Sequence, residues 1–567
     1  MTEVVRKDIQ KMLKKAGVTE VMEFTVPPKR EMGDIAMPCF ALAKAWKKSP
    51  ADVAKELAEK CATVSSSTIQ EVKAVGPYLN FFVNDIALAT DVLKSIGKEK
   101  DKYGRHVDGK KKKVLVEFAQ PNTHKAFHIG HLRNIVTGES IARIMQNSGY
   151  KVVRVNFQGD VGMHIAKCLW GIFALRDEYE AIKEKTLDEQ IAFLGKAYAH
   201  GAKAFEEDAS AKEEIIGYNE KVYVKDPSIR DVYETTRAWS LSYFDRIYRR
   251  LGTGFDRLYF ESEVFERGRE IVKKFVQKGV FMESEGAVIF PGSQFGLHDR
   301  VFLNSKGFPT YEAKDVGLAE QHLKTFKPEK IIHVVAKEQI EYFKVVFKAL
   351  ESVFPQSTGK EYHLPYGWVQ LKEGKMSSRT GNVILAEWLI QEVKQTIASI
   401  AAGNDIHDKE DVIEKVSLAA VKYGFLKTGV QNDIAFDLEE SVSTSGDSGP
   451  YLLYIVARIK SILRKADVTK VPKKIVVNTL APSEKEVMLQ LAGFPEVTRA
   501  AGVAYDPSLI AKYVFSLAQA FNTFYHDCPV LHADETTKQF RLQLIAAVEQ
   551  VMINGLYLLG IETVEEM

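Results

Sequence analysis

The strongest constraint on the fold is a short apolar run, VLVEF at residues 114–118, which is followed by a loop, a helical pattern and a second apolar run. Short, continuous apolar runs are typical of strands that are buried on both faces of a parallel sheet. The helical pattern covers about residues 130–147, and the second run, VVRVNF, covers residues 152–157. This succession is a βαβ unit, so we predict an α/β domain with a doubly wound, Rossmann-like parallel sheet.

The loop after the first predicted strand carries PNTHKAFHIGHLRN, residues 121–134. In doubly wound sheets this loop meets a helix N-terminus, which favours phosphate groups. Gly130 allows a flat ligand to approach the backbone, and His128 and His131 can donate hydrogen bonds to a phosphate that gains charge during a reaction. Two surface histidines at a helix start are the alternative, but the position directly after VLVEF favours a nucleotide site.

A second motif, GKMSSRTGN at residues 374–382, is a basic loop bracketed by glycines. Glycines allow a loop to move, and the cations Lys375 and Arg379 can stabilise a triphosphate. Basic loops of this kind are common, so the prediction of a flexible clamp over ATP depends on the pairing of this loop with the first motif.

The texture of the sequence divides the rest of the chain. Alternation around Gly76–Pro77 predicts strands in an N-terminal α+β module, and the charged residues 97–113 predict a linker. After about residue 405 the pattern is nearly all helical, with a capping box predicted at Ser483 and Glu486. We therefore predict three domains, residues 1–97, 98–405 and 406–567, with a helical insertion at about residues 165–275 of the second.

Composition limits the classes of partner and compartment. The net charge of the 567 residues is only +2, so any RNA-binding surface must come from local clusters of Lys and Arg. The run Lys110–Lys113 is interpreted as solvated, with RNA contact as the alternative. The four cysteines lie far apart, which argues against a zinc site and indicates reduced thiols. With no signal peptide and no membrane-spanning run, the sequence predicts a cytoplasmic protein without a membrane partner.

The two motifs together carry a resemblance to a known family. HIGH at 128–131 with KMSSR at 375–379 resembles the signature pair of class I aminoacyl-tRNA synthetases, and the wider sequence is similar to the arginyl members of that class. The matching segments are GDIAMPCFALAK (33–44), VGPYLNFFVN (75–84), PNTHKAFHIGHLRN (121–134), FQGDVG (157–162), SGDSGPYLLYIVARIKSILRKA (445–466) and FNTFYHDCPVL (521–531). The resemblance implies an appended tRNA-binding domain, a catalytic domain and an all-helical anticodon-binding domain.

The resemblance also assigns residues to ligands. A carboxylate can pair with a guanidinium in a planar, bidentate manner, so acidic groups suit an arginine site. The matching positions for arginine are Asn122, Glu261, Tyr311, Asp315 and Gln339. The spacing of Tyr311 and Asp315 puts both on one helix face. The matching positions for ATP are His128, Gly130, His131, Lys375, Met376, Ser377 and Ser378.

One position departs from the general class I pattern. The second signature loop usually reads KMSK, and its second lysine contacts the phosphates, whereas Ser378 stands in that place here. Arginyl enzymes are described as supplying this charge from a lysine just before HIGH, and Lys125 fits that role. The predicted catalytic residues are therefore His128, His131, Lys125, Lys375 and Arg379.

Contacts with RNA are predicted at two places. Bases of a tRNA loop are bound by aromatic stacking and by polar edges. The resemblance points to Tyr78, Asn80 and Phe82 for the tRNA elbow, and to Tyr451, Tyr454 and Arg458 for the anticodon region. Packing in a protein core is the alternative for each of these aromatic residues.

The implied activity is that of an arginine–tRNA ligase. It uses L-arginine, ATP with substrate-bound Mg²⁺ and tRNA(Arg), with no metal held by the protein, and tRNA binding can precede activation. We predict a monomer. The alternatives are a small-molecule nucleotidylyltransferase, which is usually much shorter, a catalytically silent RNA-binding paralogue, and another class I synthetase such as a cysteinyl one. The two appended modules argue against the first alternative, and the retained HIGH, KMS and pocket residues argue against the second. The acidic pocket and the absence of a zinc-ligand cluster argue against the third.

Overall fold

The computed structural model describes residues 3–20, 22–372, 384–403, 406–466, 475–477 and 479–567. Its largest sheet has five parallel strands in the order β11-β10-β4-β5-β6. The strands are β4 Lys113–Glu117, β5 Lys151–Gln158, β6 Arg257–Phe260, β10 Lys330–Ala336 and β11 Glu361–Tyr366. The chain order reverses between β4 and β10, and ligands bind at such a switch point in doubly wound sheets. The predicted doubly wound α/β fold is confirmed.

The central strand β4 is buried on both faces. The helices that cover the sheet are α5 Ile129–Asn147, α11 Glu261–Val276 and α12 Tyr311–Phe326. Val114 and Val116 belong to the core that includes α5. Leu115 points the other way, into a core with Val264 and Leu318 of α11 and α12. The continuous apolar run is therefore explained by helices on both sides of one strand.

Arg133 ties α5 to the segments that lead into the second motif. Its guanidinium is buried and donates to the carbonyl oxygens of Gly367 and Trp368 at 2.6 and 2.8 Å. It also donates to the carbonyl oxygens of Val430 and Asn432 at 2.9 and 2.8 Å. The four carbonyl oxygens lie just before the paired strands β12 Val369–Leu371 and β13 Ile434–Phe436. Arg133 therefore holds this parallel pair against α5.

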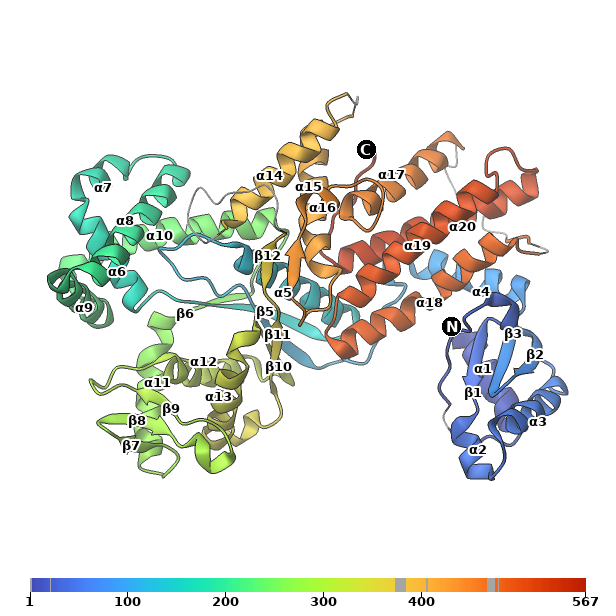
Figure 1. The fold of residues 1–567 in the computed structure, drawn as a ribbon, viewed down its shortest axis with the longest axis horizontal. Helices are drawn as coiled ribbons and strands as arrows, with labels where there is room; N and C mark the ends of the chain where they lie inside the picture. The colour runs from blue at the N-terminus through green and yellow to red at the C-terminus, as the bar shows by residue number, and fades with distance from the viewer. Residues whose placement is uncertain (1–2, 21, 373–383, 404–405, 467–474, 478) are drawn as a thin grey trace.

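A helical insertion follows β5 and projects from one side of the sheet, as Figure 1 shows. It comprises α6 Met163–Ala174, α7 Arg176–Ile182, α8 Leu187–Glu207, α9 Ala209–Val224 and α10 Pro227–Arg250. The predicted insertion at about residues 165–275 is too long, because β6 already returns the chain to the sheet and α11 covers it. The strand β6 consists only of RLYF between charged residues. Four residues are too few to show the alternation of apolar and polar residues that indicates a strand.

A small antiparallel sheet and one further helix complete the catalytic region. The sheet has the order β7-β8-β9, with β7 Met282–Ser284, β8 Ala287–Phe290 and β9 Arg300–Leu303. A seven-residue connection, residues 304–310, leads from β9 into α12. After β10, a 3-10 turn at Lys337–Gln339 leads into α13 Ile340–Val353.

The N-terminal module is α+β, as predicted. It contains α1 Glu3–Lys15, β1 Ile35–Pro38, α2 Phe40–Trp46, α3 Pro50–Ala62, β2 Ile69–Val75, β3 Tyr78–Val83 and α4 Asp85–Glu99. Its antiparallel sheet has the order β1-β3-β2. Figure 1 shows this module beyond the C-terminal helices, and α4 packs against α18 and α20.

The charged residues 97–113 do more than link two domains. Tyr103 is buried, and its hydroxyl donates to the Leu491 carbonyl oxygen at 2.9 Å. Asn554 donates to the carbonyl oxygens of Lys100 and Tyr103 at 2.9 and 3.2 Å. This stretch is therefore held on the C-terminal bundle by hydrogen bonds that pattern analysis could not foresee.

The C-terminal region is a helical bundle, as predicted. Its helices are α14 Ala386–Ile400, α15 Lys409–Leu426, α16 Leu438–Ser441, α17 Gly449–Lys465, α18 Pro482–Ala504, α19 Ser508–Asp527 and α20 Glu535–Leu558. The predicted capping box is wrong by two residues, because Glu484, rather than Glu486, accepts from the Ala481 backbone N–H at 2.8 Å. Within the described residues, no helix is long and apolar enough to cross a membrane.

Candidate active site

The first motif forms the N-terminus of α5. His128 is the N-cap, and its Nδ1 accepts from the Gly130 backbone N–H at 3.1 Å. The His128 backbone N–H in turn donates to Nδ1 of His131 at 3.2 Å. A ring nitrogen that accepts a hydrogen bond carries no proton, so each neutral ring keeps its proton on Nε2. Both Nε2–H groups are thus left to donate to a ligand.

The two imidazoles are uncharged at neutral pH. Burial lowers the pKa of His128, and the charge of Lys125 lowers it further. Burial, His128 and Lys125 together lower the pKa of His131 to about 3. The histidines are therefore neutral donors, and positive charge at the start of α5 comes from Lys125 and from the helix N-terminus.

The loop between β4 and α5 has an unusual backbone. Ala119, Gln120 and His124 have φ angles of 76°, 45° and 64°, in the left-handed region that costs energy for residues other than glycine. Asn122 pairs with Gly159 across a parallel bridge, and a Cβ at Gly159 would lie 2.1 Å from Asn122 Oδ1. Gly159 is thus required for Asn122 to lie where it does.

Lys125 lies in the same loop, three residues before His128. Its Nζ is 4.8 Å from the centre of the Tyr198 ring of α8, in a cation–π contact. The insertion therefore contacts the lysine that the sequence assigns to the phosphate site.

The second motif, with Lys375, Met376, Ser377, Ser378 and Arg379, lies outside the described residues. The residues after it pair directly with the first motif. The Ile129 backbone N–H donates to the Ile384 carbonyl oxygen at 2.9 Å, and Ala386 N–H donates to the Phe127 carbonyl oxygen at 2.9 Å. The chain therefore leaves the second motif beside the N-terminus of α5.

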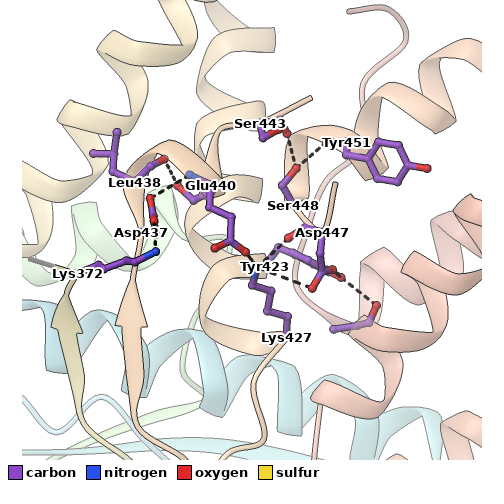
Figure 2. A network of polar contacts seen from close by, with 12 residues as sticks. Lys372, Tyr423, Lys427, Asp437, Leu438, Glu440, Ser443, Asp447, Ser448 and Tyr451 are labelled. Atoms are coloured by element: carbon purple, nitrogen blue, oxygen red, sulfur yellow. Dashed lines mark hydrogen bonds and ion pairs between the residues drawn. The ribbon is translucent and has the colours of Figure 1, made fainter. Parts of the chain in front are cut away.

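A polar network joins Lys372, two residues before the second motif, to the helical bundle, as Figure 2 shows. Lys372 pairs with Asp437 at 3.0 Å. Lys427 pairs with Glu440 at 2.6 Å and donates to the Asp447 carbonyl oxygen at 2.9 Å. The Tyr423 hydroxyl donates to the Asp447 carboxylate, and Ser448 caps α17.

The predicted amino-acid residues gather at the start of α12. Tyr311 opens this helix and its side chain is 58% exposed, as a wall of a site should be. Glu261, at the start of α11, is buried and accepts from Lys314 Nζ at 2.7 Å. Lys314 also lies 4.8 Å from the Tyr311 ring centre. Glu261 is thus already paired within the protein.

Asp315 lies one residue after Lys314. Its carboxylate accepts from the Tyr342 hydroxyl of α13 at 2.7 Å. Burial raises the pKa of Asp315 to about 7, although the hydrogen bond from Tyr342 opposes this shift. The group is therefore poised to gain a cationic partner, because a nearby positive charge would restore its ordinary pKa.

Gln339 ends the 3-10 turn at Lys337–Gln339, directly after β10. This places it at the switch point of the sheet, together with the loop that carries Asn122. The structure therefore brings the loop after β4, the start of α12 and the end of β10 to the carboxyl edge of the sheet.

Sequence reasoning missed several residues of the cleft. Lys314 and Tyr342 stand beside the predicted acids, and the string YEAKD could have drawn attention to Lys314. His333, on β10, is a further such residue. Its Nδ1 lies 3.2 Å from the Glu117 carboxylate and its Nε2 lies 2.8 Å from the Glu361 carboxylate. Both contacts reach across neighbouring strands, so no local pattern indicates them.

The predicted RNA contacts differ in exposure. In β3, Tyr78 is 38% exposed, Asn80 is buried with an unpartnered Oδ1, and Phe82 lies 5.0 Å from Lys73 Nζ. In α17, Tyr451 is buried and its hydroxyl accepts from Asn522 at 2.7 Å, which fits the core alternative.

Tyr454 and Arg458 are half-buried neighbours on α17, joined by a hydrogen bond. Tyr454 also lines a cavity of about 360 Å³ with Ile413 and Met567. These two residues remain candidates for contact with RNA, whereas Tyr451 serves the core.

Three family models match successive parts of the chain. They describe the arginyl tRNA synthetase N terminal domain (residues 3–83), the class I (R) tRNA synthetase catalytic domain (92–438) and the DALR anticodon binding domain (452–567). The catalytic-domain model alone spans more than half of the chain. The chain belongs to the arginyl-tRNA synthetase family.

Individual members of the family agree with this assignment. Arginine–tRNA ligases of Clostridium perfringens and Treponema denticola are each 34% identical to the chain, over 96% and 97% of its length and 95% of their own. The Thermus thermophilus arginyl-tRNA synthetase structure has a TM-score of 0.82 at 26% identity and covers both chains fully. The Plasmodium falciparum arginyl-tRNA synthetase, with a TM-score of 0.77 at 19% identity, shares the fold over the full length of both chains.

Proposed function

We propose that the cleft at the carboxyl edge of the sheet joins L-arginine to ATP and then passes the arginyl group to tRNA(Arg). Family membership assigns the overall reaction, arginine–tRNA ligation. The single observation that carries the site assignment is the convergence of the α5 N-terminus with the acidic start of α12 at one switch point. The first holds the nucleotide and the second holds the amino acid.

The guanidinium of the substrate binds Asp315, with Tyr311 and Gln339 beside it. Asp315 is suited to this role because burial disfavours its charge until a cation arrives. Glu261 contributes indirectly, through its ion pair with Lys314, because Lys314 already occupies its carboxylate. Asn122 holds the polar groups of the amino-acid backbone.

The phosphates of ATP bind at the N-terminus of α5. Nε2–H groups of His128 and His131 donate to the α-phosphate, Gly130 admits the nucleotide, and Lys125 supplies charge. The residues that the sequence assigns to the second motif, namely Lys375, Met376, Ser377, Ser378 and Arg379, complete this side. Mg²⁺ arrives on ATP as part of the substrate. Among the described residues, no group of three or more His, Cys, Asp and Glu side chains could hold a metal ion.

The reaction has two balanced steps. A carboxylate oxygen of arginine bonds to the α-phosphorus and pyrophosphate leaves, which gives arginyl-adenylate. A terminal ribose hydroxyl of tRNA, the 2′-hydroxyl in the class I pattern, then attacks the arginyl carbonyl and AMP leaves. The protein contributes orientation and stabilisation of charge.

The tRNA contacts two distant parts of the molecule. Tyr78 and Phe82 meet its elbow, while Tyr454 and Arg458 meet the anticodon region. Asn80, which the sequence also assigned to the elbow, is buried within β3 and does not reach the RNA. We propose that the chain acts as a cytoplasmic monomer, with the three domains bounded at residues 1–97, 98–405 and 406–567.

The test is ATP–pyrophosphate exchange with each of the twenty amino acids, with and without unfractionated tRNA. Exchange with arginine alone supports the assignment, and a requirement for tRNA shows that tRNA binds first. Exchange with another amino acid would refute the roles of Tyr311, Asp315 and Gln339. Absence of exchange in folded protein that binds tRNA would favour a catalytically silent RNA-binding protein.

A further inference from the structure

The loop that carries Asn122 and Lys125 is fastened to the helical insertion through His124. This side chain is fully buried, and His124 has the left-handed φ of 64°. Its backbone N–H donates to Ser240 Oγ at 2.9 Å, and its Nε2 lies 2.9 Å from Thr236 Oγ1. Thr236 and Ser240 lie one turn apart on α10, more than a hundred residues along the chain.

The direction of these hydrogen bonds is fixed by the helix. The Thr236 hydroxyl donates to the Val232 carbonyl oxygen at 2.7 Å, and the Ser240 hydroxyl donates to the Thr236 carbonyl oxygen at 3.2 Å. Each hydroxyl proton is thus used within α10, so both oxygens are acceptors towards the loop. His124 then donates from Nε2 to Thr236. Its Nδ1 lies 3.0 Å from the Thr123 hydroxyl, which is also 3.3 Å from the Gly159 carbonyl oxygen.

The charge state of His124 agrees with this arrangement. Burial, together with His164 and Arg237, lowers the pKa of His124 to about 3, so the ring stays neutral. The ring also stacks on Tyr233 of α10, with centroids 6.2 Å apart and an interplanar angle of 16°. A neutral, stacked ring with both nitrogens engaged cannot contact substrate and serves only to hold the chain.

We infer that His124 is a positioning residue for Lys125 and Asn122, and that α10 of the insertion, through Thr236 and Ser240, sets where these two side chains meet the substrates. The anchor holds the backbone in a conformation that residues other than glycine otherwise avoid. The insertion then positions Lys125 in two ways. Helix α10 holds its backbone through His124, and Tyr198 of α8 contacts its ammonium group. This inference rests on the proposed role of Lys125 at the phosphates.

The decisive variants are Thr236→Val and Thr236→Ser. Valine has nearly the shape of threonine but offers no acceptor to His124, whereas serine keeps the oxygen. We expect Thr236→Val to lower the rate constant of arginine-dependent ATP–pyrophosphate exchange about tenfold, because small misplacements of reacting groups are costly. Thr236→Ser should retain nearly the wild-type rate. Thr235→Val, the half-buried neighbour on the same helix, is the matched control and should also retain it.

A double-mutant cycle separates positioning from general damage. If the anchor acts through Lys125, Thr236→Val should cost much less in a Lys125→Ala background than in the wild type. Wild-type activity of Thr236→Val would overturn the inference, and so would an equal tenfold loss in the wild type and in both the Lys125→Ala and the Asn122→Ala backgrounds. If Lys125→Ala itself is fully active, the proposed role of Lys125 fails instead.

Folding is checked by thermal unfolding of every variant. Should Thr236→Val not fold, Ser240→Ala tests the same anchor, because it removes the acceptor of the His124 backbone N–H together with one hydrogen bond inside α10. Its expected loss is severalfold and should again shrink when Lys125 is absent. An undiminished loss there would contradict the inference in the same way.

Discussion

The proposed nucleotide side of the site takes Lys125, His128 and His131 from one short stretch of chain, whereas the proposed amino-acid side gathers its acidic and polar groups from α11, α12 and the start of α13. The first side uses neutral imidazoles at a helix N-terminus, and the second uses buried carboxylates. Contiguous groups are positioned by backbone geometry, and dispersed charged groups are positioned by one another. The two sides should therefore fail differently when they are altered.

The largest expected effect is on stability and lies on the amino-acid side. Lys314→Met leaves Glu261 buried without its partner, which should cost about 3–5 kcal/mol in the free energy of unfolding. Urea unfolding measures this loss. The double variant Glu261→Gln/Lys314→Met removes both charges and should recover most of it. A double variant that is no more stable than the single one would show that the pair is not what holds this side together.

Asp315→Asn should abolish recognition of the guanidinium with little change in stability. Loss of a desolvated, charged hydrogen-bond partner predicts a decrease in kcat/KM for arginine of about 100-fold or more. The KM for ATP should stay near its wild-type value, which steady-state exchange kinetics will show. Asp299→Asn, at an exposed position, is the matched control. A proportional loss for ATP would mean that the two sides are not separate.

On the nucleotide side, Lys125→Ala should lower the rate of adenylate formation about 30-fold, as expected for one charge on a reacting phosphate. Lys375→Ala should have the smaller effect, because Ser378 leaves the second motif without its usual second lysine. Single-turnover measurements with saturating arginine and ATP compare the two. The reverse order would contradict the idea that Lys125 supplies the missing charge.

The pH dependence should differ between the sides as well. If Asp315 binds arginine as a carboxylate, as proposed, its pKa of about 7 predicts that kcat/KM for arginine falls about tenfold per pH unit below that value. The KM for ATP should depend much less on pH, because burial and Lys125 lower the pKa of His128 and the pKa of His131 is about 3.

The smallest effect is expected for Tyr342→Phe, which sharpens the pH comparison. It removes the hydrogen bond that stabilises the Asp315 carboxylate, so the midpoint of the arginine profile should move to higher pH by about half a unit. Profiles of wild type and variant, measured in one buffer series, test this. A midpoint that moves to lower pH would contradict the assigned direction of the hydrogen bond.

The sequence predicted whatever depends on local pattern. The run VLVEF indicated the buried strand, and the HIGH tetrapeptide indicated the phosphate side, because strand, loop and helix follow one another directly. The strand β6 escaped because four residues carry no readable period. Lys314 and His333 escaped because their partners, Glu261, Glu117 and Glu361, meet them only after the chain has folded. Tyr103 escaped because a charged stretch gives no sign of the bundle that covers it.

Arg133 shows how the same molecule treats two guanidinium groups. The Arg133 side chain donates to four backbone carbonyl oxygens, which do not titrate and cannot rotate away. The Arg133 guanidinium therefore stays bound for as long as the protein is folded. The substrate guanidinium must depart on tRNA in every cycle. In the proposed site it meets the Asp315 carboxylate, whose charge depends on pH. A substrate site built from four fixed carbonyl oxygens, like that of Arg133, would bind arginine tightly but release it slowly. The residence time of the guanidinium, rather than its affinity, therefore distinguishes the structural arginine from the substrate.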